Sequence, residues 1–117
     1  MNMKENIIEQ KSFQFAVRIV TMYRYLLAEK KEYVLSKQLL RAGTSVGANV
    51  KEAICGFTKP DFRAKMSIAH KEINETEYWL RLLFETRYLS QEQFDSIFLD
   101  AREINKIISK ILISSAP

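Results

Sequence analysis

Apolar residues recur every three or four positions along most of this chain, which is the spacing that places side chains on one face of an α-helix. Only three Gly and two Pro interrupt the 117 residues. An all-β protein would need turn residues about every 8–12 positions, so these are too few for one. The sequence therefore predicts an all-α fold in one domain with a single hydrophobic core.

Local signals divide the pattern into four helices, which we expect over about residues 12–29, 33–55, 59–87 and 91–113. Thr58 and Ser90 are residues that N-caps favour, and Pro60 suits a first helical turn. Gly56 tolerates the left-handed conformation that often ends a helix. The connections are short, so consecutive helices should be antiparallel neighbours. We predict an antiparallel up-down-up-down four-helix bundle that spans residues 1–117.

The first predicted helix has two apolar stripes. One consists of Phe13, Val17, Val20 and Leu27, and the other of Phe15, Ile19, Met22 and Leu26. Together they make an apolar face wider than the seam of a coiled coil. Either this helix is central within its own bundle, or it also buries a face against another subunit, and the sequence leaves both open.

The second predicted helix is unusual between Ser36 and Glu52, because small and polar residues crowd its middle. Gly43 and Gly47 lie inside it, and each costs about 1 kcal/mol relative to Ala in a helix interior. Two glycines four positions apart favour a close approach by another helix or a bend. This segment is therefore expected to be a packing surface.

A polar line is expected to run along one face of the same helix and across to the third. It consists of Ser45, Asn49, Glu52, Glu72 and Glu75. Antiparallel pairing of the two helices would bring Ser45 near Glu72 and Arg41 near Glu75. It would also bring Glu52 near Lys65. We expect hydrogen bonds and ion pairs here that fix the register, since an unpaired buried polar group costs about 1–3 kcal/mol.

The formal net charge is +4, from 18 Lys and Arg against 14 Asp and Glu. This mild excess permits nucleic-acid binding without requiring it. The candidate contacts lie in the second helix, in the connection after it or at the start of the third: Lys37, Arg41, Lys51, Lys59, Arg63 and Lys65. Gathered in space, they would bind a phosphate backbone. The alternative is a solvated face that Glu52 and Asp61 partly neutralise.

We expect neither catalysis nor a metal or cofactor site. A di-iron bundle needs two Glu-x-x-His motifs, and the only histidine, His70, belongs to none. His70 lies beside an apolar stripe, which favours an ordinary helix histidine over a general base. Ser45 has no histidine within sequence reach, and the chain has no Gly-rich phosphate loop.

Three further features favour a cytoplasmic protein. Cys55 is the only cysteine, so no internal disulfide can form. The N-terminus lacks the apolar run of a signal peptide. No stretch reaches the length of apolar sequence that a membrane span requires.

Three blocks of the chain resemble the bacterial four-helix-bundle family of 23S rRNA intervening-sequence proteins. They are Lys11–Ala16, Gln38–Ala53, and Asp61-Phe62 followed by Ile68–Leu80. The blocks stand in the family's order, and the resemblance covers nearly the whole chain. Two departures are Cys55-Gly56-Phe57, where the family is usually more polar, and His70, where relatives often carry an aliphatic residue.

The resemblance implies that the bundle assembles with itself into a cyclic homopentamer. The family is also similar to the accessory variability protein of diversity-generating retroelements, a basic pentamer that binds a reverse transcriptase and RNA. Fold likeness alone transfers no function. We therefore expect a non-enzymatic, homo-oligomeric adaptor that binds RNA or DNA through a basic surface. The alternative is a scaffold that docks a protein partner and has no nucleic-acid role.

Overall fold

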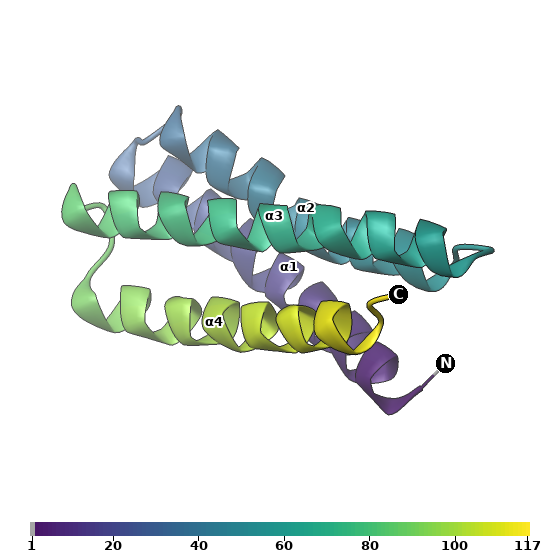
Figure 1. Cartoon of the computed structure of the whole chain (residues 1–117). Coiled ribbons are helices and arrows are strands. Elements are labelled where there is room, and N and C mark those ends of the chain that lie inside the picture. The colour runs from purple at the N-terminus through teal and green to yellow at the C-terminus, as the bar shows by residue number, and fades with distance from the viewer. Residues whose placement is uncertain (1) are drawn as a thin grey trace.

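The computed structural model describes residues 2–117, which form four α-helices. These are α1 (Met3–Lys30), α2 (Leu35–Ile54), α3 (Lys59–Glu85) and α4 (Gln91–Ser114). Each helix packs on the next, and α4 returns to contact α1 (Figure 1). The result is an elongated bundle of 45 × 20 × 19 Å, which confirms the predicted four-helix fold.

Helix α1 begins at Met3, nine residues before the start that the sequence predicted. Asn2 caps it, because its side-chain oxygen accepts a hydrogen bond from the Glu5 backbone N–H at 2.9 Å. The Glu5 carboxylate in turn accepts one from the Asn2 backbone N–H at 3.3 Å. This capping box starts two helical turns that precede the predicted start. They contain Ile8, which is completely buried.

Helix α2 begins at Leu35 instead of Tyr33, and Glu32 sets this start. Its carboxylate accepts hydrogen bonds from the backbone N–H groups of Val34, Leu35 and Ser36 at 3.2, 2.9 and 2.7 Å. These groups would otherwise lack partners at a helix N-terminus. Burial raises the pKa of Glu32, but these bonds and one from the Ser36 side chain outweigh it, so the pKa lies below its usual value.

The later boundaries follow the predicted caps closely. Thr58 accepts from the Asp61 backbone N–H at 3.1 Å, and Ser90 forms a capping box with Gln93. Helix α3 ends two residues early, because Arg87 takes a positive φ of 70°. Gly56 follows the end of α2 without a positive φ, so our reason for a glycine there was wrong. A Cβ at Gly56 would lie 3.2 Å from the Asp61 Cβ, which makes close approach the physical reason.

Only one of the two apolar stripes of α1 faces the core. Phe15, Ile19 and Leu26 are buried almost completely. Phe13 and Val17 are instead 69% and 52% exposed. The stripe that begins at Phe13 therefore lies largely outside the bundle of its own chain.

The two glycines inside α2 permit a close approach by α1. A Cβ on Gly43 would lie 2.7 Å from Cγ1 of Ile19, closer than real side chains come. A Cβ on Gly47 would lie 3.1 Å from the backbone carbonyl oxygen of Ser12. The close approach predicted for these glycines is therefore present, and α1 is the helix that makes it.

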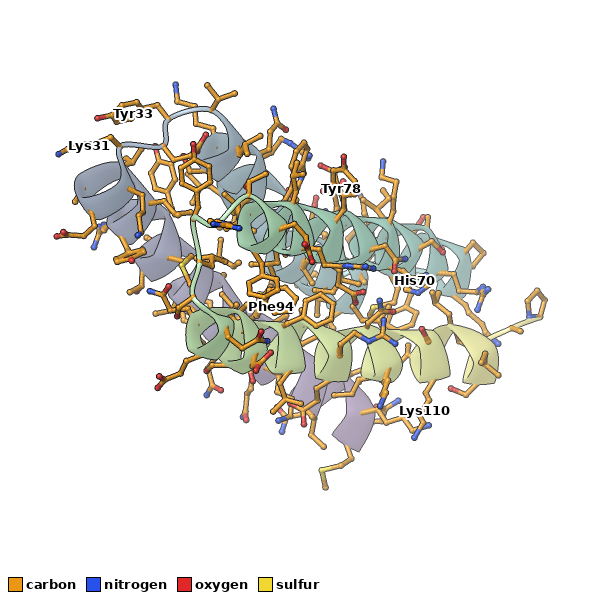
Figure 2. The ribbon with its side chains drawn as sticks, turned by 90° about the vertical axis from the view of Figure 1, so that its left-hand side faces the viewer. Lys31, Tyr33, His70, Tyr78, Phe94 and Lys110 are labelled. Carbon is orange, nitrogen blue, oxygen red and sulfur yellow. The ribbon has the colours of Figure 1, made fainter. Side chains whose placement is uncertain are left out.

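Aromatic rings fill the space between α3 and α4 near the α3–α4 turn. Figure 2 shows Phe94 between these two helices. Its ring stacks on Phe84 with centroids 4.5 Å apart and on Phe98 with centroids 4.7 Å apart. The three rings thus pack α3 against α4 at this end of the bundle.

Candidate nucleic-acid interface

The predicted polar line pairs α2 with α3 in the expected register. Arg41 donates to Glu72 at 3.1 Å and also to Glu75. Lys65 lies 3.8 Å from the Glu52 carboxylate. The Arg41–Glu75 and Glu52–Lys65 neighbours that antiparallel pairing predicted are therefore both present.

The expected pairing of Ser45 with Glu72 takes a different form. Glu72 is buried, and its carboxylate accepts from Arg41, with Lys71 3.9 Å away. The Asn49 side chain turns back along its own helix and donates to the Ser45 carbonyl oxygen at 2.9 Å. Arg41 thus neutralises the buried carboxylate of Glu72, and this ion pair gives Arg41 a role in holding α2 against α3.

The six basic candidates do not form one row. Arg41 and Lys65 pair between α2 and α3, whereas Lys51 donates to Glu9 on α1 at 3.0 Å. Arg63 turns to α4, where it donates to the Leu112 carbonyl oxygen at 2.6 Å and to Ser115 Oγ at 2.8 Å. Four of the six candidates are therefore committed to neighbouring helices.

The remaining two candidates lie at opposite ends of the bundle. Lys37 is in the first turn of α2, and Lys59 is the first residue of α3. Both side chains are exposed. Since α2 spans the length of the bundle between them, they cannot contact the same short stretch of phosphates.

Charge is nevertheless unequal along the bundle axis. We define the turn end as the half that contains the α2–α3 turn, which comprises residues 2–16, 45–72 and 103–117. Both chain termini lie at this end (Figure 1). It carries nine of the 18 basic residues but only six of the 14 acidic ones, so most of the net positive charge lies there.

Four lysines of the turn end form no ion pair among residues 2–117. They are Lys4, Lys59, Lys106 and Lys110, and all are exposed. Figure 2 shows Lys110 on the solvent side of α4. Sequence reasoning missed three of the four, because they lie far from α2 in the chain. The antiparallel topology, which brings both termini to the α2–α3 turn, could have found them.

The pKa of Lys51 lies above that of an ordinary lysine. A hydrogen bond to the Glu9 carboxylate and the charge of that group raise the Lys51 pKa, and Cys55 adds to this effect. The charge of the pair is largely cancelled, so Lys51 adds little to the field of the turn end. That field comes from Lys59, the three other lysines without ion pairs, and Arg63, whose hydrogen-bond partners are neutral.

A separate apolar groove runs between α1 and α2. It has a volume of about 780 Å³, and its lining includes Phe13, Ala16, Gly47 and Ala48. Small residues of α2 and the exposed Phe13 of α1 therefore line the same groove. The stripe of α1 left outside the bundle thus adjoins a concave surface.

The polar residues between α3 and α4 form a hydrogen-bonded chain. Ser109 Oγ lies 3.1 Å from His70 Nε2, which resembles a nucleophile and a base. Ser109 also donates to Asn105, whose side chain donates to Asn74 and Glu77 at 2.9 and 2.7 Å. Because the links from Ser109 to His70 and from Asn105 to Asn74 and Glu77 cross from α4 to α3, the chain fixes the two helices against each other.

The described residues offer no preformed metal site and no membrane-spanning helix. Residues 2–117 contain no group of three or more His, Cys, Asp and Glu side chains arranged to hold a metal ion. Within the same residues, no helix combines the length and the apolar character needed to cross a bilayer. Cys55 is exposed and free.

The molecule is thus a small four-helix-bundle protein with a basic end and an apolar outer stripe. The model of the family described as 23S rRNA-intervening sequence protein matches residues 4–110. The chain belongs to this family, as the three sequence blocks indicated.

A solved relative has the same fold. It is a protein with unknown function from the S23 ribosomal protein family of Bacteroides thetaiotaomicron VPI-5482. It is 53% identical to this chain, with a TM-score of 0.92, and the match covers 94% of this chain and 98% of the relative. No curated protein matches the chain significantly.

Proposed function

We propose that this protein is a non-enzymatic, homo-oligomeric adaptor that binds RNA through the basic turn end of the bundle. The observation that carries the proposal is the excess of basic over acidic residues in that half, together with four exposed lysines outside ion pairs. Such lysines bind phosphates as point charges and release counterions on binding. Lys59 remains the central candidate; in the same half, Lys51 and Lys65 are paired with carboxylates, whereas Arg63 bonds only to neutral groups and keeps its full charge.

The test is fluorescence anisotropy of a labelled RNA at about 50 and 200 mM salt. Affinity should fall steeply with salt, and the combined change Lys4→Glu, Lys59→Glu and Lys110→Glu should lower it at least about tenfold. The matched control reverses three exposed charges of the opposite half: Arg24→Glu, Lys37→Glu and Arg81→Glu. Equal losses of affinity in both variants, or binding that salt does not weaken, would contradict RNA binding through the turn end.

Self-assembly, with a pentamer as the expected size, is supported by the outer stripe of α1. Phe13 and Val17 are more than half exposed, and Phe13 lines a groove of about 780 Å³ that offers an apolar surface to an equivalent helix of a second copy. Heterologous contacts of this kind close into rings when the rotation permits. Repetition around a ring would also multiply the field of the basic ends.

Light scattering tests the assembly directly. We expect a mass five times that of the 13.7 kDa chain, and Phe13→Glu should convert it to monomers. Gln14→Glu, which adds the same charge at the next and also exposed position, is the control and should leave the mass unchanged. A wild-type protein that is monomeric at all concentrations would exclude the ring.

The apolar stripe also supports the second candidate function, a scaffold for a protein partner. In that case the groove beside Phe13 receives a foreign helix, and the basic end has no role. Capture of one defined protein that survives nuclease treatment and is lost in Phe13→Glu would favour the scaffold. Binding of purified RNA by the purified protein would favour the adaptor.

A further inference from the structure

The most exposed large apolar side chain of the described residues lies at the centre of the turn end. Phe57 is in the α2–α3 turn, and its side chain is 99% exposed. Other exposed apolar residues, such as Val34 and Leu99 at 71%, retain more contact with the bundle. A ring that touches nothing contributes nothing to the core, so the fold does not account for its presence.

The backbone on both sides of Phe57 is held in place. The Gly56 N–H donates to the Ala53 carbonyl oxygen at 3.1 Å, and the Phe62 N–H donates to the Thr58 carbonyl oxygen at 3.0 Å. Thr58 in addition caps α3. The close contact between Gly56 and Asp61 keeps the turn compact. Phe57 is therefore displayed from a fixed support, which lowers the entropy cost of binding through the ring.

The surroundings of the ring are polar and basic. The two neighbours of Phe57 in the chain, Gly56 and Thr58, line a cavity of about 370 Å³. Asn2, Ser114 and Ser115 contribute polar groups to its wall, and the two lysines Lys4 and Lys59 outweigh the single acidic residue, Glu5. A nucleotide complements each of these features. Its flat base can stack on the ring, its sugar hydroxyl groups can bond to the polar groups, and its negative phosphate can pair with the lysines.

We propose that Phe57 stacks on an unpaired base while the lysines of the turn end bind the adjoining phosphates. This inference rests on the proposed function and narrows its ligand to single-stranded or looped RNA. The reason is steric, because the faces of bases are covered in a regular duplex and exposed in a single strand. Stacking on aromatic side chains tolerates any base, so the site should show little sequence preference.

The experiment compares one labelled RNA of about 16 nucleotides, chosen without self-complementarity, with the same strand annealed to its complement. The wild-type protein should bind the single strand at least about tenfold more tightly. Phe57→Ala should lose about tenfold in single-strand affinity and keep its duplex affinity, while Phe57→Trp should retain the preference. Leu99→Ala, which removes an exposed apolar side chain from the opposite half, is the control and should change neither value.

Several outcomes would overturn the inference, and they separate it from the proposed function. If Phe57→Ala binds both RNAs as the wild type does, stacking is refuted. The adaptor function would still stand if RNA binding depends on salt and is lost in the triple lysine variant. If Phe57→Ala instead loses binding to phosphatidylserine vesicles, the ring is a lipid contact. If it lowers the mass in light scattering, the ring docks on a second copy. If the wild type binds neither RNA, both proposals fail.

Discussion

The two faces of α1 have similar apolar composition and opposite surroundings. The inner face, with Phe15 and Ile19, is covered by the bundle and is almost fully buried. The outer face, with Phe13 and Val17, remains more than half exposed within residues 2–117. The comparison teaches that helical periodicity identifies an apolar stripe, whereas only the arrangement of the other helices decides what covers it.

The largest expected effect lies on the inner face. Phe15→Ala should lower the free energy of unfolding by about 3–5 kcal/mol, because it removes a fully packed ring and leaves a cavity. Urea unfolding followed by circular dichroism would measure this. A loss below about 1 kcal/mol would mean that the inner face is not the core.

The contact between α1 and α2 provides the next test. Gly43→Ala should destabilise the protein by about 1–3 kcal/mol, because the added methyl group collides with Ile19 and overpacking outweighs the gain in helix propensity. The same change in an Ile19→Ala background should be neutral or stabilising. Additive effects of the two changes would rule out the close contact.

Glu32, at the junction of α1 and α2, gives a smaller effect that depends on pH. Its carboxylate caps α2, so Glu32→Gln should cost about 1 kcal/mol at neutral pH. Because the pKa of Glu32 is lowered on folding, its contribution is present above the unfolded value of about 4.3 and is lost as the pH falls through the lower folded value. Unfolding curves between about pH 6 and pH 3 should therefore converge for variant and wild type. The exposed control Glu29→Gln should follow the wild-type profile throughout.

The smallest effect on the stability of a single chain is expected on the outer face. Phe13→Ala should change the free energy of unfolding of a monomeric background by less than about 0.5 kcal/mol, since the ring is mostly in water already. Its effect should appear instead in the oligomeric mass. A large loss of monomer stability would remove the distinction between the two faces.

Much of the fold was predictable because its determinants are local. Apolar spacing identified four helices, and Thr58 and Ser90 marked two starts correctly. The start of α1 was missed because its cap, Asn2 with Glu5, precedes a stretch with little apolar periodicity. Glu32 lies between the first two predicted helices, and nothing in the sequence shows that its carboxylate caps the second one.

The candidate interface was less predictable because it depends on partners from distant segments. Lys51 and Arg63 looked available in the sequence, yet Glu9 and the end of α4 engage them. Lys4 and Lys110 are far from Lys59 in the sequence, and only the antiparallel topology brings them to the same end of the bundle. A list of basic residues therefore becomes a surface only after each charge has been matched with its neighbours.

The location of the termini has a practical consequence for experiments. Both ends of the chain emerge at the same end of the bundle as the α2–α3 turn (Figure 1), and Asn2 and Ser115 line one cavity with Lys59. An affinity tag fused to either terminus would therefore add its own groups to the surface under study and could imitate or screen RNA binding. Fluorophores and crosslinkers are better attached at the α3–α4 turn, for example through Arg87→Cys in a Cys55→Ser background, where they report on the bundle from its opposite end.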